Sequence, residues 1–356
     1  MKETLVHSAQ LRGLSTADLL ERARHLCLPG LRQAVRRLAT PLDIVAAYHF
    51  GWIDRHGEPV TGNGGKMMRP ALALLSAHAV GGDPEFGALG GVAVELVHNF
   101  SLLHDDFMDG DETRRNRATA WTVFGPSLAV LTGDALLALS SDVLLSDGPP
   151  HTSRQDRARA VQRLTTATGR LIAGQADDLS FERRDRIGVR DCMDMLGNKT
   201  GALLACSAVI GAVLAGGDDA TADALGRYGH HLGLAFQAVD DLLGIWGDPE
   251  VTGKPRWSDL RRRKKSLPVC AALAEGGRSS RRLAVLLAAD GSDDEDELPL
   301  AERALLIEEA GGRAWAKDEA RRRHTLALAE LSEVEMPRVT FAHFAALADF
   351  AVERNR

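Results

Sequence analysis

Apolar residues recur along the chain with the three- to four-residue spacing of helices, and no stretch alternates convincingly with the two-residue period of a strand. The longest apolar helix that we expect covers residues 87–108 and ends directly in carboxylates. Further helices are expected over residues 31–39, 71–80, 127–146, 153–183, 189–215, 220–245, 265–288, 299–311, 314–333 and 341–354. No segment has the composition of a domain linker. The pattern predicts a single all-α domain.

Composition supports this fold class and limits the classes of binding partner that we expect. Aromatic residues make up 5% of the chain, too few for a β sandwich or barrel, which uses aromatic and β-branched side chains. The net charge is -6, whereas a nucleic-acid-binding protein usually has a basic excess, so no nucleic acid partner is expected. The four cysteines, Cys27, Cys192, Cys206 and Cys270, show no CxxC spacing. We interpret them as buried apolar side chains in a reducing compartment.

Targeting and membrane signals are weak. The N-terminus has no basic segment followed by an apolar one, as a secretory signal would. The most membrane-like stretch, residues 201–216, is shorter than the roughly 20 residues needed to span a bilayer. We therefore expect a cytoplasmic protein without a membrane span. Residues 289–297 form an acidic stretch that we interpret as a solvated loop.

A carboxylate cluster follows the longest apolar helix. Asp105 and Asp109 are four residues apart, so on a helix both point from one face, separated by about 6 Å along the axis. Like charges at this spacing repel each other, and with Asp106 they follow an apolar segment where desolvation adds to the cost. Hard oxygen ligands of this kind suit Mg²⁺. Taken alone, the cluster is equally compatible with a solvated acidic helix end.

A second carboxylate pair, Asp240 and Asp241, ends another apolar helix at residues 232–239. Two facing helices that each end in carboxylates would let several Mg²⁺ ions bridge both helices to one diphosphate. A helix-end pair neutralised by a nearby Arg or Lys remains the alternative for this pair alone.

Basic residues beside glycine turns or acidic clusters form a third group. They are Lys66, Arg69, Arg114, Arg115, Lys199, Lys254, Lys264 and Lys265. Arg binds phosphate oxygens in pairs, whereas Lys supplies a point charge. Each residue alone is compatible with an ordinary surface charge. Their placement suggests two diphosphates, one bound through metal and one by side chains alone.

Together these residues resemble the motifs of the trans-isoprenyl diphosphate synthase (polyprenyl synthetase) family, in the order of that family. The matches are Gly64-Gly65-Lys66-Met67-Met68-Arg69-Pro70, His98 through Asp109 with Arg114-Arg115, Thr132-Gly133-Asp134, Gly174-Gln175 with Asp178, Lys199-Thr200, Phe236 through Asp241, Gly253-Lys254-Pro255 and Lys264 through Pro268. The resemblance, closest to geranylgeranyl diphosphate synthases, implies a synthetase domain over residues 41–356 after a helical extension at 1–40. It implies an antiparallel helix bundle of the isoprenoid synthase type with a central active-site cavity, and a homodimer.

The resemblance also implies the activity, which is Mg²⁺-dependent head-to-tail (1'-4) condensation of isopentenyl diphosphate with allylic diphosphates. By similarity, the metal ligands are Asp105, Asp106, Asp109, Asp240 and Asp241. The allylic diphosphate would contact Arg114, Lys199, Lys254 and Lys264, and isopentenyl diphosphate would contact Lys66, Arg69, His98 and Arg115. Thr200 and Gln237 would line the reacting carbons, and with Lys199 and Lys254 they complete the expected catalytic set.

The second aspartate-rich motif departs from the family pattern. It usually reads DDxxD, but here Gly244 stands where the third Asp would be. If Asp240 is the main metal ligand on that helix, the missing carboxylate should weaken the interactions that orient the metal ligands, rather than abolish Mg²⁺ binding.

The product length is expected to depend on the helix face before Asp105. Phe100 and Ser101 lie five and four residues upstream, about 6 to 7.5 Å along the helix. A single aromatic five residues before an uninserted motif resembles one group of geranylgeranyl diphosphate synthases, so we favour that product over farnesyl and longer diphosphates. Simple core packing of Phe100 is the other interpretation.

Two other functions remain open. A class I terpene cyclase shares the fold and an aspartate-rich motif, but after residue 200 we find no Asn/Asp, Ser/Thr and Glu triplet with the helical spacing of its second metal motif. A noncatalytic subunit of a synthase heteromer is the third candidate.

Overall fold

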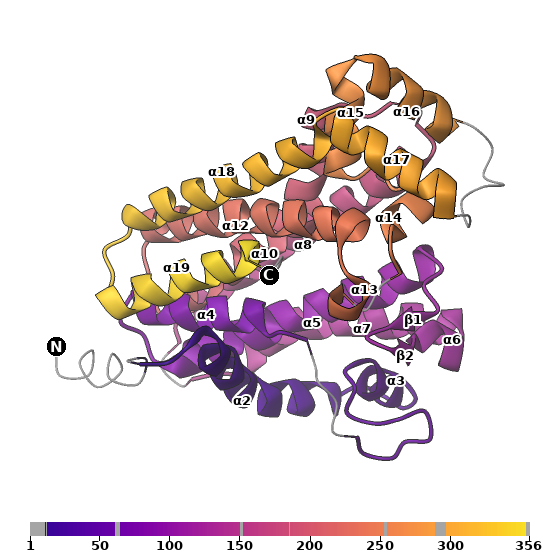
Figure 1. Cartoon of the computed structure of the whole chain (residues 1–356). Coiled ribbons are helices and arrows are strands. Elements are labelled where there is room, and N and C mark those ends of the chain that lie inside the picture. Colours follow the sequence, from indigo (N-terminus) through magenta and orange to yellow (C-terminus); the bar gives the residue numbers. More distant parts are fainter. Residues whose placement is uncertain are drawn as a thin grey trace. The chain divides into compact units, whose positions relative to one another are not determined.

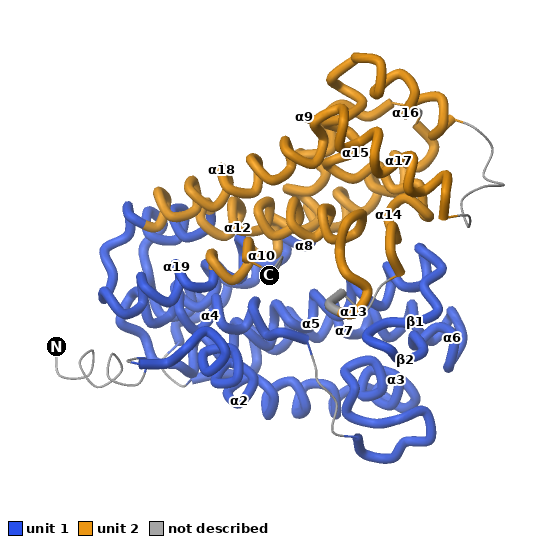
Figure 2. Tube along the Cα trace, in the orientation of Figure 1, with its two compact units in different colours: residues 1–168, 205–226, 332–347 blue, residues 169–204, 227–331, 348–356 orange. Residues whose placement is uncertain are grey.

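The computed structural model describes residues 11, 13–60, 65–149, 152–184, 186–252, 255–288 and 297–353. These residues form helices joined by short connections, with one two-stranded hairpin (Figure 1). The all-α prediction is confirmed. The chain divides into two compact units: unit 1 comprises residues 1–168, 205–226 and 332–347, and unit 2 comprises 169–204, 227–331 and 348–356 (Figure 2).

Unit 1 is built around α5 (Pro84–Met108), the helix that carries the first carboxylate cluster. Four helices pack against it: α2 (Thr16–Val35), α4 (Met68–Ala79), α7 (Pro126–Ser146) and α11 (Ile210–Leu214). Most α5 side chains before the cluster are buried. A helix that is apolar on nearly all sides has to be surrounded by other helices, and this packing holds the end of α5 in a defined place.

The remaining elements of unit 1 are shorter or are shared with unit 2. Unit 1 contains α3 (Leu42–His49), β1 (Thr113–Arg114), β2 (Arg117–Ala118) and α6 (Ala120–Phe124). The helices α8 (Arg154–Glu182), α10 (Ala202–Ser207), α12 (Asp219–Trp246), α18 (Gly312–Ser332) and α19 (Arg338–Val352) contribute residues to both units.

The N-terminal region forms one long helix that begins well before residue 31. Ser15 caps α2, since its hydroxyl accepts from the Asp18 N–H at 3.2 Å and its own N–H donates to the Asp18 carboxylate at 3.0 Å. The predicted separate helix at 31–39 is wrong, because α2 continues through Pro29 to Val35. Leucine, alanine and cysteine side chains on both sides of Pro29 are buried, so packing offsets the hydrogen bond that proline removes.

Unit 2 contains short helices between the longer ones. They are α9 (Val189–Leu196), the π-helical turn η1 (Gly197–Gly201), α13 (Pro249–Thr252), α14 (Ser258–Arg261), α15 (Leu267–Glu275), α16 (Arg278–Ala288) and α17 (Glu297–Glu309). The single helix expected over 265–288 is divided, because Gly276 takes a left-handed conformation (φ 78°) that ends α15. Two buried clusters form the core, one around Met195, Leu234 and Leu267 and one around Ile245, Leu283 and Ile307.

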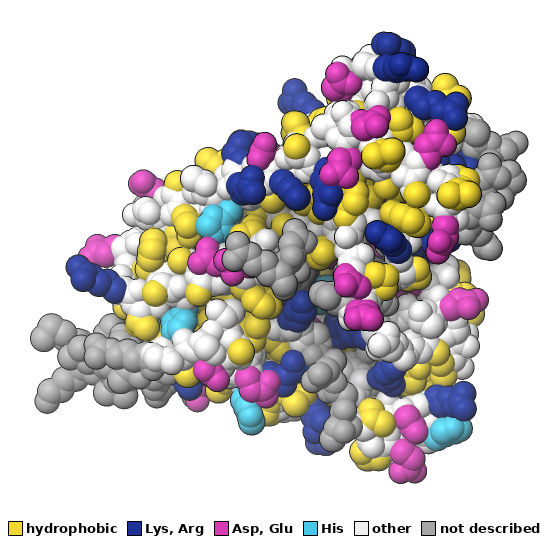
Figure 3. All heavy atoms as spheres, in the orientation of Figure 1, with side chains coloured by type: hydrophobic (Ala, Val, Ile, Leu, Met, Phe, Trp, Pro, Cys, Tyr) yellow, Lys and Arg dark blue, Asp and Glu magenta, His cyan; other side chains and the backbone are white. Residues whose placement is uncertain are grey.

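The cysteines agree with expectation, and charges of both signs occur on the described surface (Figure 3). All four cysteines are buried free thiols, as their scattered spacing predicted. Basic and acidic side chains are interspersed on the described surface drawn in Figure 3, in keeping with 43 basic and 49 acidic residues.

Three helices are long and apolar enough, by length and composition, to cross a membrane: Pro84–Met108, Pro126–Ser146 and Val189–Leu214. The sequence pattern did not lead us to expect any. The most apolar windows of the first and third are 78% buried within the protein, so core packing accounts for their composition. The corresponding window of α7 is 44% buried.

Candidate active site

The first carboxylate cluster lies where α5 ends. Met108 is the last helical residue, and Asp109 caps the helix by donating its N–H to the Asp105 carbonyl at 2.8 Å. The Asp111 N–H donates to the Asp106 carbonyl, also at 2.8 Å. Acidic side chains at a helix C-terminus add to the negative end of the helix dipole. Without a cation, the carboxylates repel one another and the negative end of the helix. Binding of a cation would therefore stabilise the cluster.

Asp106 connects this cluster to an arginine. Its side chain is 2% exposed, and Oδ1 accepts a hydrogen bond from Nε of Arg114 at 2.6 Å. Oδ2 is buried without a hydrogen-bond partner. Burial raises the pKa of Asp106 to about 6, although the charge and hydrogen bond of Arg114 act in the opposite direction. The carboxylate thus holds Arg114 and keeps one oxygen available.

The hairpin β1–β2 presents arginines from a strained turn. Thr113 pairs with Ala118 and Arg114 with Arg117, which leaves Arg115 and Asn116 as the two turn residues. Both have positive φ, 52° and 60°, as a type I' turn requires. Arginine is uncommon in this conformation, and strain of this kind is often found at functional sites. The turn places arginines at positions 114, 115 and 117 close together.

These arginines line a cavity of about 540 Å³ in unit 1. Its lining includes five cationic side chains, Arg24, Lys66, Arg114, Arg115 and Arg117, and one carboxylate, Asp106. Tyr48, His49 and Phe50 of the α3 end complete one wall. A concave site with this excess of positive charge suits a phosphate-bearing ligand.

Two histidines near the cavity are neutral. The pKa of His49 is lowered to about 3 by burial and by the charges of Arg114 and Arg115. The pKa of His98 is also well below its ordinary value, through burial and the charges of Arg69 and Arg115. A neutral imidazole can donate one N–H to an anion without adding charge.

Glu95, on α5, is the buried acid behind the basic group. It is 7% exposed, and Asn99 Nδ2 donates to its Oε1 at 3.2 Å. Burial raises its pKa, while the charges of Arg69, Arg115 and Arg24 act to lower it. Glu95 thus partly balances the charges of Arg69, Arg115 and Arg24, and motif reasoning did not single it out.

Arg24 is the second residue that sequence reasoning missed. It lies on α2, in the segment for which we had no functional interpretation, and its Nη2 donates to the Gly65 carbonyl at 2.9 Å.

Tyr48, His49 and Arg117 of the cavity wall were missed too. Arg117 stacks over the Tyr48 ring at 4.5 Å and donates to the Ile53 carbonyl at 2.9 Å. Of these residues, only Arg117 had a local signal in the sequence, because it lies close to the arginine pair Arg114-Arg115.

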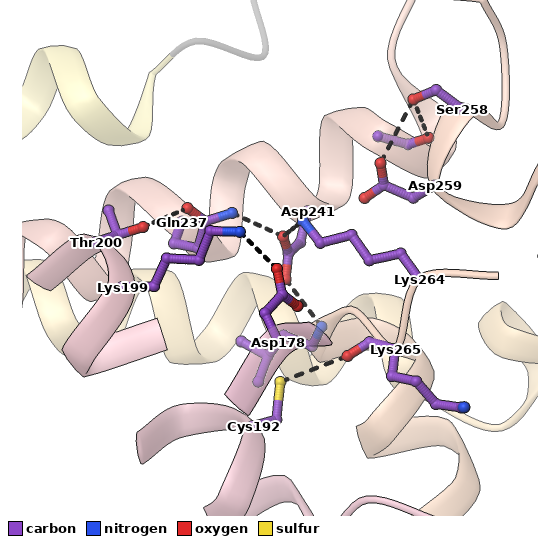
Figure 4. A network of polar contacts seen from close by, with 12 residues as sticks. Asp178, Cys192, Lys199, Thr200, Gln237, Asp241, Ser258, Asp259, Lys264 and Lys265 are labelled. Carbon is purple, nitrogen blue, oxygen red and sulfur yellow. Dashed lines mark hydrogen bonds and ion pairs between the residues drawn. The ribbon is translucent and has the colours of Figure 1, made fainter. Parts of the chain in front are cut away.

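A second polar network lies in unit 2 (Figure 4). Lys199, on η1, donates from Nζ to Asp178 of α8 at 2.5 Å. Thr200 donates from its hydroxyl to Oε1 of Gln237 at 2.9 Å, and Nε2 of Gln237 donates to Oδ1 of Asp241 at 2.9 Å. These hydrogen bonds form two groups, Lys199 with Asp178 and Thr200 with Gln237 and Asp241, and the adjacent residues Lys199 and Thr200 of η1 bring the two groups side by side.

Asp241 organises this network from a buried position. Its residue is 1% exposed, and Oδ2 accepts from the Leu267 N–H at the start of α15 at 2.9 Å. Nζ of Lys264 lies 3.6 Å from Oδ1. Burial tends to lower the pKa of Lys264, but Asp241 and the neighbouring carboxylates Asp259, Asp178 and Asp240 raise it above its ordinary value. Asp241 thus has both oxygens in contact with protein groups.

The π-helical turn at Lys199 is held between two helices by glycines. A side chain at Gly174 of α8 would come within 2.8 Å of the Lys199 Cα, and one at Gly233 of α12 within 2.6 Å of the Gly201 Cα. Residues one turn later on these helices, Asp178 and Gln237, make the contacts with Lys199 and Thr200. π turns inside helices are frequent at functional sites.

The structure brings the predicted residues together as two groups. Unit 1 contains Asp105, Asp106, Asp109, Arg114, Arg115, Lys66, Arg69, His98, Phe100 and Ser101, and unit 2 contains Lys199, Thr200, Gln237, Asp240, Asp241 and Lys264. Lys254 lies outside the described residues.

The carboxylates fit Mg²⁺ only if water and substrate phosphates complete its coordination. Among the described residues, no three His, Cys, Asp or Glu side chains are placed to hold a metal ion by themselves. Mg²⁺ is usually held by one or two carboxylates together with water and substrate phosphates rather than by a complete protein cage. The orphaned Oδ2 of Asp106 and the clustered carboxylates at the end of α5 agree with that mode.

Comparison with known proteins agrees with the motifs. Residues 51–303 match the polyprenyl synthetase family. A (2E,6E)-farnesyl diphosphate synthase of Mycobacterium tuberculosis is 47% identical over 341 residues, which cover 96% of this chain and 94% of the relative. A geranylgeranyl diphosphate synthase of the same organism is 44% identical over 337 residues, covering 94% and 95%. The crystal structure of a polyprenyl synthetase from Streptomyces coelicolor A3(2) superposes with a TM-score of 0.90 at 61% identity, covering 94% of this chain and 98% of that one.

Proposed function

Because this chain belongs to the polyprenyl synthetase family and is a prenyltransferase that elongates prenyl diphosphates, we propose that its main product is geranylgeranyl diphosphate. The observation that supports a two-diphosphate reaction is the cavity lined by five cations beside the α5 carboxylates. One diphosphate fits the cations, and the other fits the carboxylates through metal.

Isopentenyl diphosphate is proposed to bind in the basic cavity of unit 1. Lys66 and Arg115 line it, and Arg69 and His98 belong to the same electrostatic environment. The His98 imidazole, neutral because of burial and the surrounding arginines, would donate a hydrogen bond to a phosphate oxygen. Arg24 and Arg117 add positive charge that motif reasoning did not anticipate.

The allylic diphosphate is proposed to bind through Asp105 and Asp109 from α5 and through Asp240 from α12, with Arg114, Lys199 and Lys264 contacting its oxygens. Bound Mg²⁺ would neutralise the charge that develops on the departing diphosphate. Lys199 is already oriented by Asp178. The Thr200 hydroxyl donates to Gln237, so its oxygen lone pairs can face the allylic cation that isopentenyl diphosphate then attacks.

Geranylgeranyl diphosphate is favoured by the helix face preceding Asp105. Ser101 lies one turn before Asp105 on the same face of α5, and its small side chain leaves room for a growing chain. The Phe100 ring is buried and contacts His104 edge-to-face at 4.8 Å between ring centres. Phe100 would then set the far limit. Farnesyl diphosphate is the second candidate, because similar relatives include synthases of both products.

One assay tests these assignments. The pure protein is incubated with isopentenyl diphosphate, each allylic diphosphate in turn and Mg²⁺, and the products are separated by chain length. Twenty-carbon diphosphates are expected, and fifteen-carbon products would assign the alternative. Cyclic hydrocarbons would indicate a terpene cyclase, and no turnover with any allylic substrate would indicate a noncatalytic subunit.

The protein is further proposed to act as a homodimer that pairs through α7. This helix is strongly apolar yet has an exposed face on which Leu131 is 53% and Leu145 56% exposed. A second copy of the chain would cover these side chains. Light scattering should give the mass of a dimer, and the double variant Leu131→Glu/Leu145→Glu should give that of a folded monomer.

A further inference from the structure

The space beside Gly244 is occupied by a carboxylate from another part of the chain. Gly244 is four residues after Asp240 on α12, so a side chain there would point from the same face of the helix. A β-carbon added at Gly244 would lie 2.6 Å from Oδ1 of Asp259 and closer still to its Oδ2 and Cγ. The Asp259 carboxylate therefore lies where the third aspartate of a DDxxD motif would begin its side chain.

The turn that carries Asp259 is fixed to the end of α12. Asp259 lies in the short helix α14, and the preceding Ser258 hydroxyl donates to the Gly244 carbonyl at 3.2 Å (Figure 4). The Asp259 carbonyl accepts from the Lys264 N–H at 2.9 Å, and Leu260 is buried in the core of unit 2. Asp259 itself is 8% exposed. Its position is set by the Ser258 hydroxyl, by its own backbone carbonyl and by the buried Leu260 side chain.

Asp259 also shares the electrostatic environment of the second motif. It is one of the carboxylates, with Asp241, Asp178 and Asp240, that act on Lys264. Asp241 has its oxygens in contact with Gln237 and the Leu267 N–H. Because Asp241 is engaged in this way, a second metal-facing oxygen on this helix end has to come from elsewhere.

We propose that Asp259 supplies the third carboxylate that the second aspartate-rich motif lacks, so that Asp240 and Asp259 together face the divalent cation, directly or through bound water. The carboxylate that position 244 lacks in sequence is then supplied in space by α14. The proposal rests on the proposed function, since it concerns the metal that holds the allylic diphosphate. The competing role is structural, in which Asp259 only balances Lys264 and stabilises the turn.

Metal binding separates these two roles without relying on turnover. Binding of Mn²⁺ in the presence of inorganic diphosphate is measured by electron paramagnetic resonance for wild type, Asp259→Asn and Asp318→Asn. Asp318 is an exposed unit 2 aspartate whose ion pair among the described residues is with Arg321, three residues later, which makes it a matched control. Asp259→Asn should lower the apparent affinity of the weakest bound ion about 10- to 100-fold, whereas Asp318→Asn should leave it unchanged.

Relocating the carboxylate gives a second, independent test. Gly244→Asp in the wild-type background should lower the melting temperature, because the new side chain meets Asp259. Asp259→Gly alone should weaken Mn²⁺ binding as Asp259→Asn does. The double variant Asp259→Gly/Gly244→Asp should recover most of the affinity, because the carboxylate returns to the same face of α12.

Each result decides between the roles. Wild-type Mn²⁺ affinity in Asp259→Asn, with only a lower melting temperature, would overturn the proposal. If Asp259→Asn does not fold, the double variant decides, and failure of a folded double variant to bind metal would also overturn it. Absence of chain elongation by the wild-type protein would instead refute the proposed function, so the two failures are distinguishable.

Discussion

Nε of Arg114 donates to Oδ1 of Asp106 over 2.6 Å, and this ion pair joins the carboxylates at the end of α5 to the arginine-rich cavity. Arg114 belongs to β1, and Asp106 to the helix eight residues earlier. The pair therefore links the expected metal side of the site to its metal-free side through two neighbouring segments of unit 1.

Asp105→Ala and Asp241→Ala should both impair the enzyme, but for different reasons. Asp105 is expected to bind metal, so its loss should reduce kcat by orders of magnitude with little change in melting temperature. Asp241 accepts from Gln237 and from the Leu267 N–H, so its loss leaves buried donors unpaired, at about 1–3 kcal/mol for each. Steady-state kinetics and thermal unfolding of both variants check this. Equal losses of activity with equal melting temperatures would contradict it.

Arg24→Met should weaken isopentenyl diphosphate binding. Its guanidinium lines the basic cavity and donates to the Gly65 carbonyl. Loss of a charged hydrogen-bond donor is worth about 1.5–3 kcal/mol, so we expect KM for isopentenyl diphosphate to rise roughly tenfold or more while KM for the allylic substrate changes little. Arg36→Met, at the exposed end of α2, is the control. Equal effects of the two variants on KM would show that Arg24 does not contribute to isopentenyl diphosphate binding.

Asp178→Asn should reduce turnover by releasing Lys199. The Lys199 ammonium donates to Asp178 at 2.5 Å, and no other ion pair of Lys199 is present among the described residues. The amide keeps the shape of the side chain but not its charge, so Lys199 should sample other positions. We expect kcat to fall about tenfold. A variant with wild-type kcat would show that Lys199 does not need this orientation.

Ser101→Phe and Phe100→Ala should move product length in opposite directions. A phenyl ring at 101 lies one turn before Asp105 and should shorten the product toward fifteen carbons. Removal of the buried Phe100 ring should lengthen it, provided Phe100 limits the chain. Chromatography of the dephosphorylated products checks both. Products of Phe100→Ala no longer than those of wild type would leave Phe100 as core packing against His104.

Acidification should destabilise the protein through His49. Burial and the charges of Arg114 and Arg115 lower its pKa in the folded state to about 3, well below the ordinary value of 6.5. The unfolded chain therefore takes up a proton first, so the contribution of His49 to stability is complete above pH 6.5 and is lost as pH falls toward 3. Between pH 6.5 and 5 the loss should be about 1 to 2 kcal/mol. Denaturant unfolding of wild type and His49→Gln at both pH values checks this, and identical pH dependence in the two proteins would contradict it.

Local pattern was sufficient for the fold class and for the first carboxylate cluster. The apolar run before Asp105 predicted a buried helix over 87–108, and α5 covers Pro84–Met108. The i, i+4 relation of Asp105 and Asp109 follows from helix geometry alone. The local pattern gave a wrong helix boundary where packing overrides local preference, as at Pro29, which lies inside α2.

The sequence by itself determined the fold class and the motif residues that we propose to act in the reaction, because motif spacing and helical period are short-range properties. Only the tertiary structure decided how they are supported. Arg24 reaches the Gly65 carbonyl from 41 residues away, and Asp241 holds the Leu267 N–H across 26 residues. Asp259 meets the face of α12 that Gly244 leaves open. Such contacts depend on where separate helices pack, and the local pattern of one helix does not specify the side chains that another brings to it.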